Sequence, residues 1–510
     1  MITFQHLYNS MSQFKHIYGR ITLLFASISC MMGSGWLMSA HFAYKIAGNG
    51  AILSWLIGSI IVIIIAFCFS SIATRIPIAG GIGRYLAITH GIEPSRIIAW
   101  FAWLSCVAVA PTEVRTIIEY ISTIYPSVEL ISNNTLNPMG LSLSLCLMAL
   151  MTYINMKGIA LLIKFNNYIA IWKIFIPIII ALSIASFGFN TSSLNHELLS
   201  PDSSLGWHGI LNAVSTVVIF SFLGFREVTS LAGETQNPRK AIPFAIIGSV
   251  LFCMIAYIIF QIVYIGCIDT INITGITGNG PWAYLAIQLG LLWVQILLYL
   301  DMAISPGGAG LMYTATTGRL TYAMSTIQAL PKPLSALNHH GVPHKALLFN
   351  FIIGCLLLPF SWQELVKFQS IILIFAYLAG PIALNAITTS KEKADKVILT
   401  TTTILCNYII LWGGWTTYGI ILLCGSVLVA KQAYTNINNL LKNNWLIMHM
   451  ILLGLVIYIS PFEGGYVILD HVTTHIIVAI LSVILLFHSR NKRRSSDKIA
   501  HELSKIQDKE

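Results

Sequence analysis

The chain has 510 residues, of which 56% are hydrophobic and only 9% are charged, and its mean hydropathy is +0.78. Such a composition excludes an ordinary soluble domain. The formal net charge of +10 does not indicate a nucleic-acid partner, because the basic residues are concentrated in short loops between apolar segments. The nine cysteines are scattered singly, so we expect packed, reduced thiols and no disulfide framework.

Apolar segments of membrane-spanning length follow one another along the chain. They lie at residues 21–47, 50–74, 96–122, 141–156, 160–188, 209–231, 242–266, 290–317, 345–360, 368–388, 397–413, 415–431, 444–460 and 466–488. The eleventh and twelfth are separated only by Gly413 and Gly414, which puts the number of spans at about 12–14. The sequence therefore predicts an all-α polytopic membrane protein.

The loops between these segments alternate in charge, which predicts their orientation. Acidic residues such as Glu129 and Glu463 fall in one set of loops. The other set carries basic residues, among them Arg75, Arg84, Lys157, Lys164, Arg239, Lys240, Lys332, Lys393 and Arg490. We expect the basic loops and both termini in the cytosol, with 1–19 as an N-terminal segment and 489–510 as a basic tail. The first apolar run is too long for a signal peptide, so we predict a multi-pass protein of the cell membrane.

The first apolar segment contains Gly33-Ser34-Gly35 at its centre. A helix that is interrupted inside a membrane leaves amides and carbonyls unpaired, which is tolerated only where protein or a water-filled cavity satisfies them. The amides of this motif and the Ser34 hydroxyl would suit a carboxylate, and the carbonyl of Met31 would suit an ammonium group. The alternative is a packing notch in which small residues allow a close helix crossing.

Ionisable residues inside predicted spans are candidates for function because they are costly there. Lys173 lies in the middle of the fifth segment and could exchange a proton, since burial penalises its charged form; the alternative is a permanent cation paired with a carboxylate. Asp301 in the eighth segment could pair with Lys173 or carry the proton itself. Glu113 and Arg115, close to the predicted outer end of the third segment, are more typical of a vestibule or a structural pair.

The sixth segment contains a second glycine-centred interruption, at Ser221–Phe225. Interruptions at corresponding positions of two halves point to a substrate site near the midplane of a secondary transporter. The carbonyls of Phe220 and Leu223 would suit an ammonium group, and Gly224 would let the backbone approach the ligand. The Phe220 ring could cover the site, or it is simply a core aromatic. An amino acid, which carries both an ammonium and a carboxylate, is the substrate that two such breaks would bind.

The stretch from Gly224 to Pro243 resembles the GF-E…AGE-x-NP-x-x-x-IP pattern of the amino acid–polyamine–organocation transporters. The other motifs that resemble this family are Gly33-Ser34-Gly35, Ile78-Ala79-Gly80-Gly81, Arg319 to Met324, Leu330-Pro331 and Gly341-Val342-Pro343. The similarity covers residues 18–390. Within the family the chain resembles most the bacterial aspartate:proton symporter-like permeases, which share the GSGW first helix and the GFR sixth helix.

This resemblance implies a five-plus-five inverted-repeat core over residues 20–390, with discontinuous helices 1 and 6, and additional helices over 391–488. It also implies alternating access, with a lysine at the position of Lys173 taking the place that an ion holds in sodium-coupled relatives. Arg226 departs from the acidic residue common at that position. Its planar fork matches a carboxylate, which favours an acidic substrate; the alternative is a structural pair with Glu227 or Asp301.

The sequence thus predicts a secondary transporter that moves an amino acid, with aspartate or glutamate favoured, together with protons across the lipid bilayer. An exchanger and a neutral amino acid symporter are the alternatives among transporters, and a membrane-embedded amino acid sensor is the alternative from another class. We expect no enzymatic activity, no metal, no nucleic-acid partner and no cofactor, since a proton or substrate gradient would drive transport; a monomer and a homodimer both stay open. The predicted substrate-binding residues are Met31, Gly33, Ser34, Gly35, Phe220, Leu223, Gly224 and Arg226, and the predicted proton-coupling residues are Lys173, Asp301 and Glu227.

Overall fold

The computed structural model describes residues 19–78, 81–125, 127–132, 134–157, 159–195, 206–232, 235–268, 280–389, 392–427 and 445–507. The predicted N-terminal segment, apart from Gly19, and the Ala79-Gly80 and Gly233-Glu234 pairs of the motifs lie outside them. In the described part, ten helices are long and apolar enough to cross a membrane, and four further apolar helices are shorter. These helices account for each of the predicted apolar segments, so the prediction of an all-α polytopic fold is confirmed.

The helices of the two halves follow the same order. The first half consists of α2 (Arg20–Met31), α3 (Ser34–Ala47), η2 (Gly48–Gly50), α4 (Ala51–Arg75), α5 (Ile82–Thr89), α6 (Ile92–Val107), α7 (Val109–Ile124), α8 (Pro138–Met156) and α9 (Ile159–Gly188). The second half, after η3 (Thr191–Asn195), consists of α10 (Gly206–Ala213), η4 (Val214–Val218), α11 (Ile219–Phe222), η5 (Leu223–Arg226), α12 (Glu227–Ser230), α13 (Pro238–Ile268), α14 (Pro281–Gln288), α15 (Leu292–Thr326), η8 (Lys332–Ser335), α16 (His344–Leu357), α17 (Trp362–Tyr377) and α18 (Ala379–Ile387). In each half a broken first span and a long second span precede a short helix, α5 or α14. This order fits an inverted repeat of five spans.

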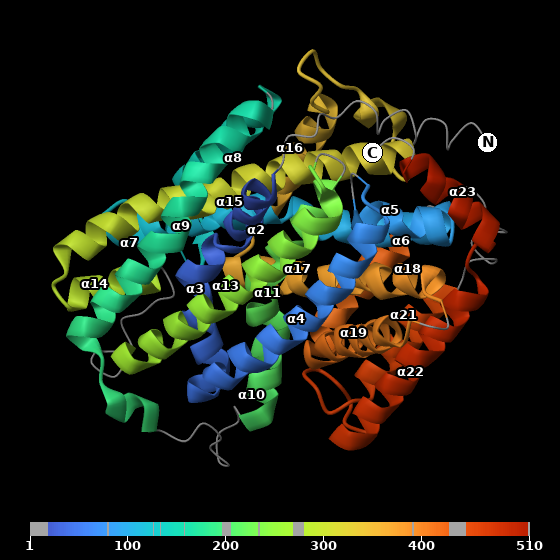
Figure 1. The fold of residues 1–510 in the computed structure, drawn as a ribbon. Helices are drawn as coiled ribbons and strands as arrows, with labels where there is room; N and C mark the ends of the chain where they lie inside the picture. Colours follow the sequence, from blue (N-terminus) through green and yellow to red (C-terminus); the bar gives the residue numbers. More distant parts are fainter. Residues whose placement is uncertain are drawn as a thin grey trace.

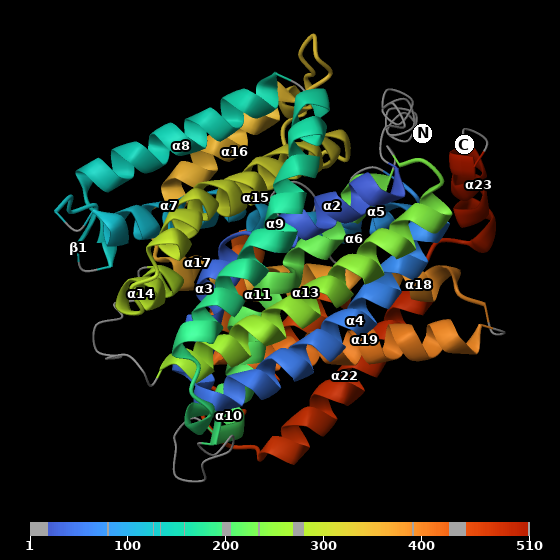
Figure 2. The same cartoon turned by 60° about the vertical axis from the view of Figure 1, so that its left-hand side comes forward.

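Beyond this repeat the chain adds α19 (Lys393–Trp412), a helix at Gly414–Val427, α21 (Trp445–Tyr458), α22 (His471–Asn491) and α23 (Ser496–Gln507). Figures 1 and 2 both place α19 and α22 together on one side of the bundle, with α8 and α16 on the opposite side, and Figure 1 places α21 beside α19 and α22. Between them, α13 packs along α4 and α2, and α15 packs along α7. A short hairpin, β1 (Ile131–Ser132) and β2 (Thr135–Leu136), pairs Ile131 with Leu136 between α7 and α8.

The outer surface of the bundle is apolar. Large hydrophobic side chains are exposed on α8, α9, α13 and α22, among them Leu150, Phe175, Ile255 and Phe487. Monomeric soluble proteins rarely expose so many such side chains. Lipid is the environment that suits this surface, whereas most of the polar and charged side chains of the spans are turned inward.

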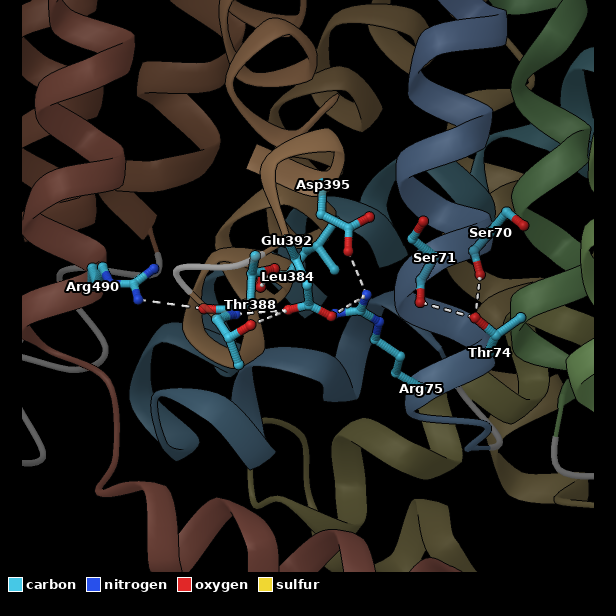
Figure 3. Close-up of polar contacts among 10 residues, drawn as sticks. Ser70, Ser71, Thr74, Arg75, Leu384, Thr388, Glu392, Asp395 and Arg490 are labelled. Carbon is cyan, nitrogen blue, oxygen red and sulfur yellow. Dashed lines mark hydrogen bonds and ion pairs between the residues drawn. The ribbon is translucent and has the colours of Figure 1, made fainter. Parts of the chain in front are cut away.

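A polar network ties the added helices to the core at the end of the bundle where α4 ends (Figure 3). Arg75, the last residue of α4, forms ion pairs with Glu392 at 3.0 Å and with Asp395 of α19. Hydrogen bonds from the Thr389 amide and hydroxyl, and then the charge of Arg75, hold the pKa of Glu392 below its usual value. At Thr388, which directly follows α18, Arg490 of α22 donates to the backbone carbonyl at 3.3 Å. The network therefore links α4, α19 and α22 around the end of α18.

Candidate substrate site

The first span is broken at the predicted place. α2 ends at Met31 and α3 begins at Ser34, and between them Met32 (φ −87°, ψ 72°) and Gly33 (φ −112°, ψ −130°) leave helical geometry. A Cβ on Gly33 would lie 2.7 Å from the Cβ of Ala309 and from Oε2 of Glu113. The discontinuous first helix is thus confirmed, and glycine is required there because α15 and a carboxylate fill the adjoining space.

A carboxylate of the protein caps the second half of this broken span. Glu113 accepts hydrogen bonds from the Ser34 amide (2.7 Å) and from the Ser34 hydroxyl (3.0 Å). These are the groups that the sequence predicted for a substrate carboxylate, at the positive end of the α3 dipole. The sequence predicted Glu113 close to the outer end of the third span. In the structure it lies deeper, because α7 stays helical and buried as far as Tyr120. It does not pair with Arg115, which binds Glu119 at 2.8 Å.

A cation of the protein lies at the other side of the break. Lys173, on α9, is fully buried and donates from Nζ to the carbonyl of Ser29 at 2.7 Å. Ser29 belongs to the last turn of α2, where carbonyls lack helical partners and the helix dipole is negative. The two ends of the broken helix therefore hold an ammonium group and a carboxylate, each at the end whose polarity complements it.

Tyr257, which the sequence reasoning missed, joins the first and sixth spans at the break. Its hydroxyl, from α13, lies 2.7 Å from the carbonyl of Met31 and 3.3 Å from that of Ser221. The Ser221 hydroxyl also bonds to that of Ser39 on α3, at 2.8 Å. A Cβ on Gly35 would lie 3.2 Å from Ser221 Oγ and 3.3 Å from Tyr257 Oη. The carbonyl predicted to bind a substrate ammonium is thus reached by a hydroxyl in this structure.

The sixth span changes helix type instead of becoming extended. It passes from a π-helical turn, η4, through the short α11 into a 3₁₀ turn, η5, which contains Gly224. A Cβ on Gly224 would lie 2.6 Å from the backbone carbon of Cys30 and the nitrogen of Met31. The glycine therefore allows direct contact between the backbones of the two broken spans. Changes of helix type of this kind often mark functional sites.

The other residues predicted around the second interruption are buried beside it. The carbonyl of Leu223 accepts from the Tyr377 hydroxyl at 3.1 Å. The Phe220 ring meets Trp362 of α17 edge to face at 5.7 Å between centroids, and Trp362 in turn stacks on Phe42 of α3. These aromatic rings connect α3, α11 and α17 beside the break. Their position is compatible with the predicted role of the Phe220 ring in covering the site.

Arg226 is almost completely buried at the end of η5. Its guanidinium lies 2.7 Å from the Glu227 carboxylate and contacts the Cys106 thiol. The side-chain Nε of Arg226 has no hydrogen-bond partner within the part of the chain that the structure describes. The pairing with Glu227 that the sequence left open is therefore present, and one donor of the fork is unused.

Asp301 joins three helices, and it is not a partner of Arg226. Its carboxylate accepts from Trp36 Nε1 on α3 (2.9 Å), Trp172 Nε1 on α9 (2.8 Å) and Ser305 Oγ on α15 (2.7 Å). Three donors satisfy a fully buried carboxylate, which would otherwise be costly. The proton-coupling roles of Lys173, Asp301 and Glu227 stay predictions.

A bundle of apolar spans whose first member is broken around buried charges belongs to the class of polytopic membrane transporters. The sequence matches the model of the family described as "Amino acid permease" over residues 18–489. Because the match covers nearly the whole chain, the protein belongs to this amino acid permease family and is a transporter, not an enzyme.

Three relatives from Bacillus subtilis (strain 168) show how broad this family is. The chain is 30% identical to a protein named "Glutamate/serine transporter AimA" over 506 residues, which cover 93% of each chain. It is 28% identical to an "Aspartate-proton symporter" over 496 residues, 92% of this chain and 95% of the relative. It is 25% identical to the "Branched-chain amino acid permease BcaP" over 428 residues, 79% of this chain and 89% of the relative.

Proposed function

We propose that the protein is a proton-coupled symporter of an acidic amino acid, with aspartate or glutamate favoured, that works by alternating access. Two relatives that match along almost their whole length carry names with glutamate or aspartate, and one of these is named a proton symporter. The distribution of basic loops supports a location in the cell membrane with both termini in the cytosol.

The observation that carries this proposal is the pair of opposite charges at the broken first span. The break can hold a carboxylate at the α3 amides and a cation at the α2 carbonyls, and it does so here with Glu113 and Lys173. A free amino acid presents the same two groups. Its carboxylate would bind at Ser34, and its ammonium would bind between the carbonyls near Met31 and Leu223. Lys173 is the proposed proton carrier because it is the buried lysine next to this site.

The preference for an acidic side chain rests on Arg226. Its planar fork suits a carboxylate, and the unused Nε is the donor through which a substrate would bind without first breaking the pair with Glu227. A neutral substrate would also leave the pair of Arg226 with Glu227 intact. In addition, the name of one relative includes serine beside glutamate. A neutral amino acid is therefore the second candidate substrate.

Uptake by purified protein in proteoliposomes tests the proposal. A panel of labelled amino acids, each measured in counterflow without a proton gradient, would identify the substrate by the largest exchange. We expect aspartate or glutamate to rank first and asparagine or glutamine well below. A panel in which only neutral amino acids exchange would reject the acidic substrate, and exchange that a pH gradient never converts into net accumulation would indicate an exchanger.

A further inference from the structure

Glu113 occupies the place that the proposed function assigns to the substrate. One carboxylate oxygen accepts from the Ser34 amide and the other from the Ser34 hydroxyl. A substrate carboxylate cannot use the same donors while Glu113 holds them. We propose that Glu113 is an internal competitor, which the substrate carboxylate displaces from Ser34, and that this competition sets the apparent affinity of the site. The inference rests on the proposed amino acid transport.

The surroundings of the break show that this carboxylate fills the site. Both of its oxygens would lie within 2.8 Å of a Cβ on Gly33, so the carboxylate packs directly against the backbone of the break. The protein also leaves a polar group unused there: the hydroxyl of Ser29, in the last turn of α2, is fully buried and has no hydrogen-bond partner among the described residues. A buried, unpaired hydroxyl is costly, so a polar ligand that reached it would be stabilised.

Lys173 is the group to which a displaced Glu113 turns. A Cβ on Gly308 of α15 would lie 3.3 Å from Lys173 Nζ, and the next residue, Ala309, adjoins Gly33 and the Glu113 carboxylate. The ammonium and the carboxylate thus lie against neighbouring positions of one helix. The titratable groups that act on Lys173 are Glu113 on α7, Asp301 on α15, Cys30 on α2 and Cys253 on α13.

Of the two carboxylates near Lys173, only Glu113 is bound by the Ser34 groups that would bind a substrate carboxylate. Asp301 is bound by two tryptophans and Ser305, so it stays in place. When the substrate releases Glu113, the carboxylate pairs with Lys173 and stabilises its charged form. Substrate binding and protonation of Lys173 then favour each other, which links transport to the proton gradient.

Binding of labelled L-glutamate to a Glu113→Gln variant tests the inference. An amide is a weaker, uncharged competitor for the Ser34 amide, so the dissociation constant should fall about tenfold. The probe 4-aminobutyrate, which lacks the α-carboxylate of glutamate, should show no such gain. Glu93→Gln is the matched control, because Glu93 lies on the same span but pairs with Arg96 at 2.8 Å away from the break; its affinity for glutamate should equal that of wild type.

Unchanged or weaker glutamate binding in folded Glu113→Gln protein would overturn the inference, and so would an equal gain for both probes. If the amide variant does not fold, Glu113→Asp gives the same test, because its shorter side chain holds Ser34 less well and should also tighten glutamate binding; weaker binding would overturn the inference. Failure of the proposed function would look different, since the wild-type protein itself would then exchange no acidic amino acid.

Discussion

Gly224→Ala should separate the two broken spans and weaken substrate binding. The added Cβ would lie 2.6 Å from backbone atoms of Cys30 and Met31, whereas carbon atoms pack at about 3.5–4.0 Å. The overlap of about 1 Å cannot be relieved by rotating a side chain, so the spans must move apart. Overpacking of this kind costs about 1–3 kcal/mol, which corresponds to a loss of about fivefold to 150-fold if it falls on the bound state.

Gly35→Ala provides the matched control for this substitution. Its Cβ would lie 3.2 and 3.3 Å from the hydroxyl groups of Ser221 and Tyr257, and the nearest backbone atom, the Ser221 Cα, would be at an ordinary contact distance of 3.5 Å. Both groups can shift by a few tenths of an ångström, so the loss of affinity should stay below about fivefold. The assay is equilibrium binding of L-glutamate to monodisperse protein, with thermal unfolding as the check of folding. Normal affinity in Gly224→Ala, or a larger loss in Gly35→Ala, would refute the reasoning about backbone contact.

Three further substitutions test the buried and surface charges. Lys173→Ala should abolish accumulation driven by a pH gradient, whereas Lys332→Ala, at an exposed residue of η8, should keep it. Unchanged accumulation in Lys173→Ala would move the proton role to another residue. Arg226→Ala should weaken aspartate or glutamate about tenfold to a hundredfold more than asparagine, with only partial rescue by Arg226→Lys, whereas equal losses would make the arginine structural. Arg75→Ala should lower the free energy of unfolding by about 1 kcal/mol or less, because its ion pairs with Glu392 and Asp395 are partly exposed. That difference should disappear in about 1 M salt, and a salt-independent loss would contradict the ion-pair explanation.

The spans and the first break could be predicted because hydrophobic length and glycine placement are local properties of the sequence. Gly33 leaves helical geometry where its neighbours predicted it. The sixth span was predicted to be interrupted, but sequence alone does not distinguish an extended break from the 3₁₀ turn at Leu223–Arg226. Both need glycine for close backbone approach, which is the property that the sequence reveals.

The hydrogen-bond partners in the site could not be predicted because they come from distant spans. Glu113 reaches Ser34 across 79 positions of sequence, and its depth depends on span boundaries that sequence places only to within a few residues. Tyr257 lies in the apolar helix α13, where no local signal in the sequence distinguishes it from a core aromatic. The sequence left open whether Arg226 pairs with Glu227, with Asp301 or with a substrate carboxylate. Adjacent residues do not face each other on a regular α-helix, whereas Arg226 and Glu227 lie at the junction of η5 and α12.

Proton-driven uptake of an acidic amino acid tests the central claim most directly. Wild-type protein in proteoliposomes, with an acidic exterior and a neutral interior, should accumulate labelled L-aspartate or L-glutamate above the external concentration. A proton ionophore should abolish this accumulation, and protein-free vesicles should show none. Equilibration without accumulation, or accumulation that the ionophore leaves unchanged, would contradict proton-coupled symport of an acidic amino acid.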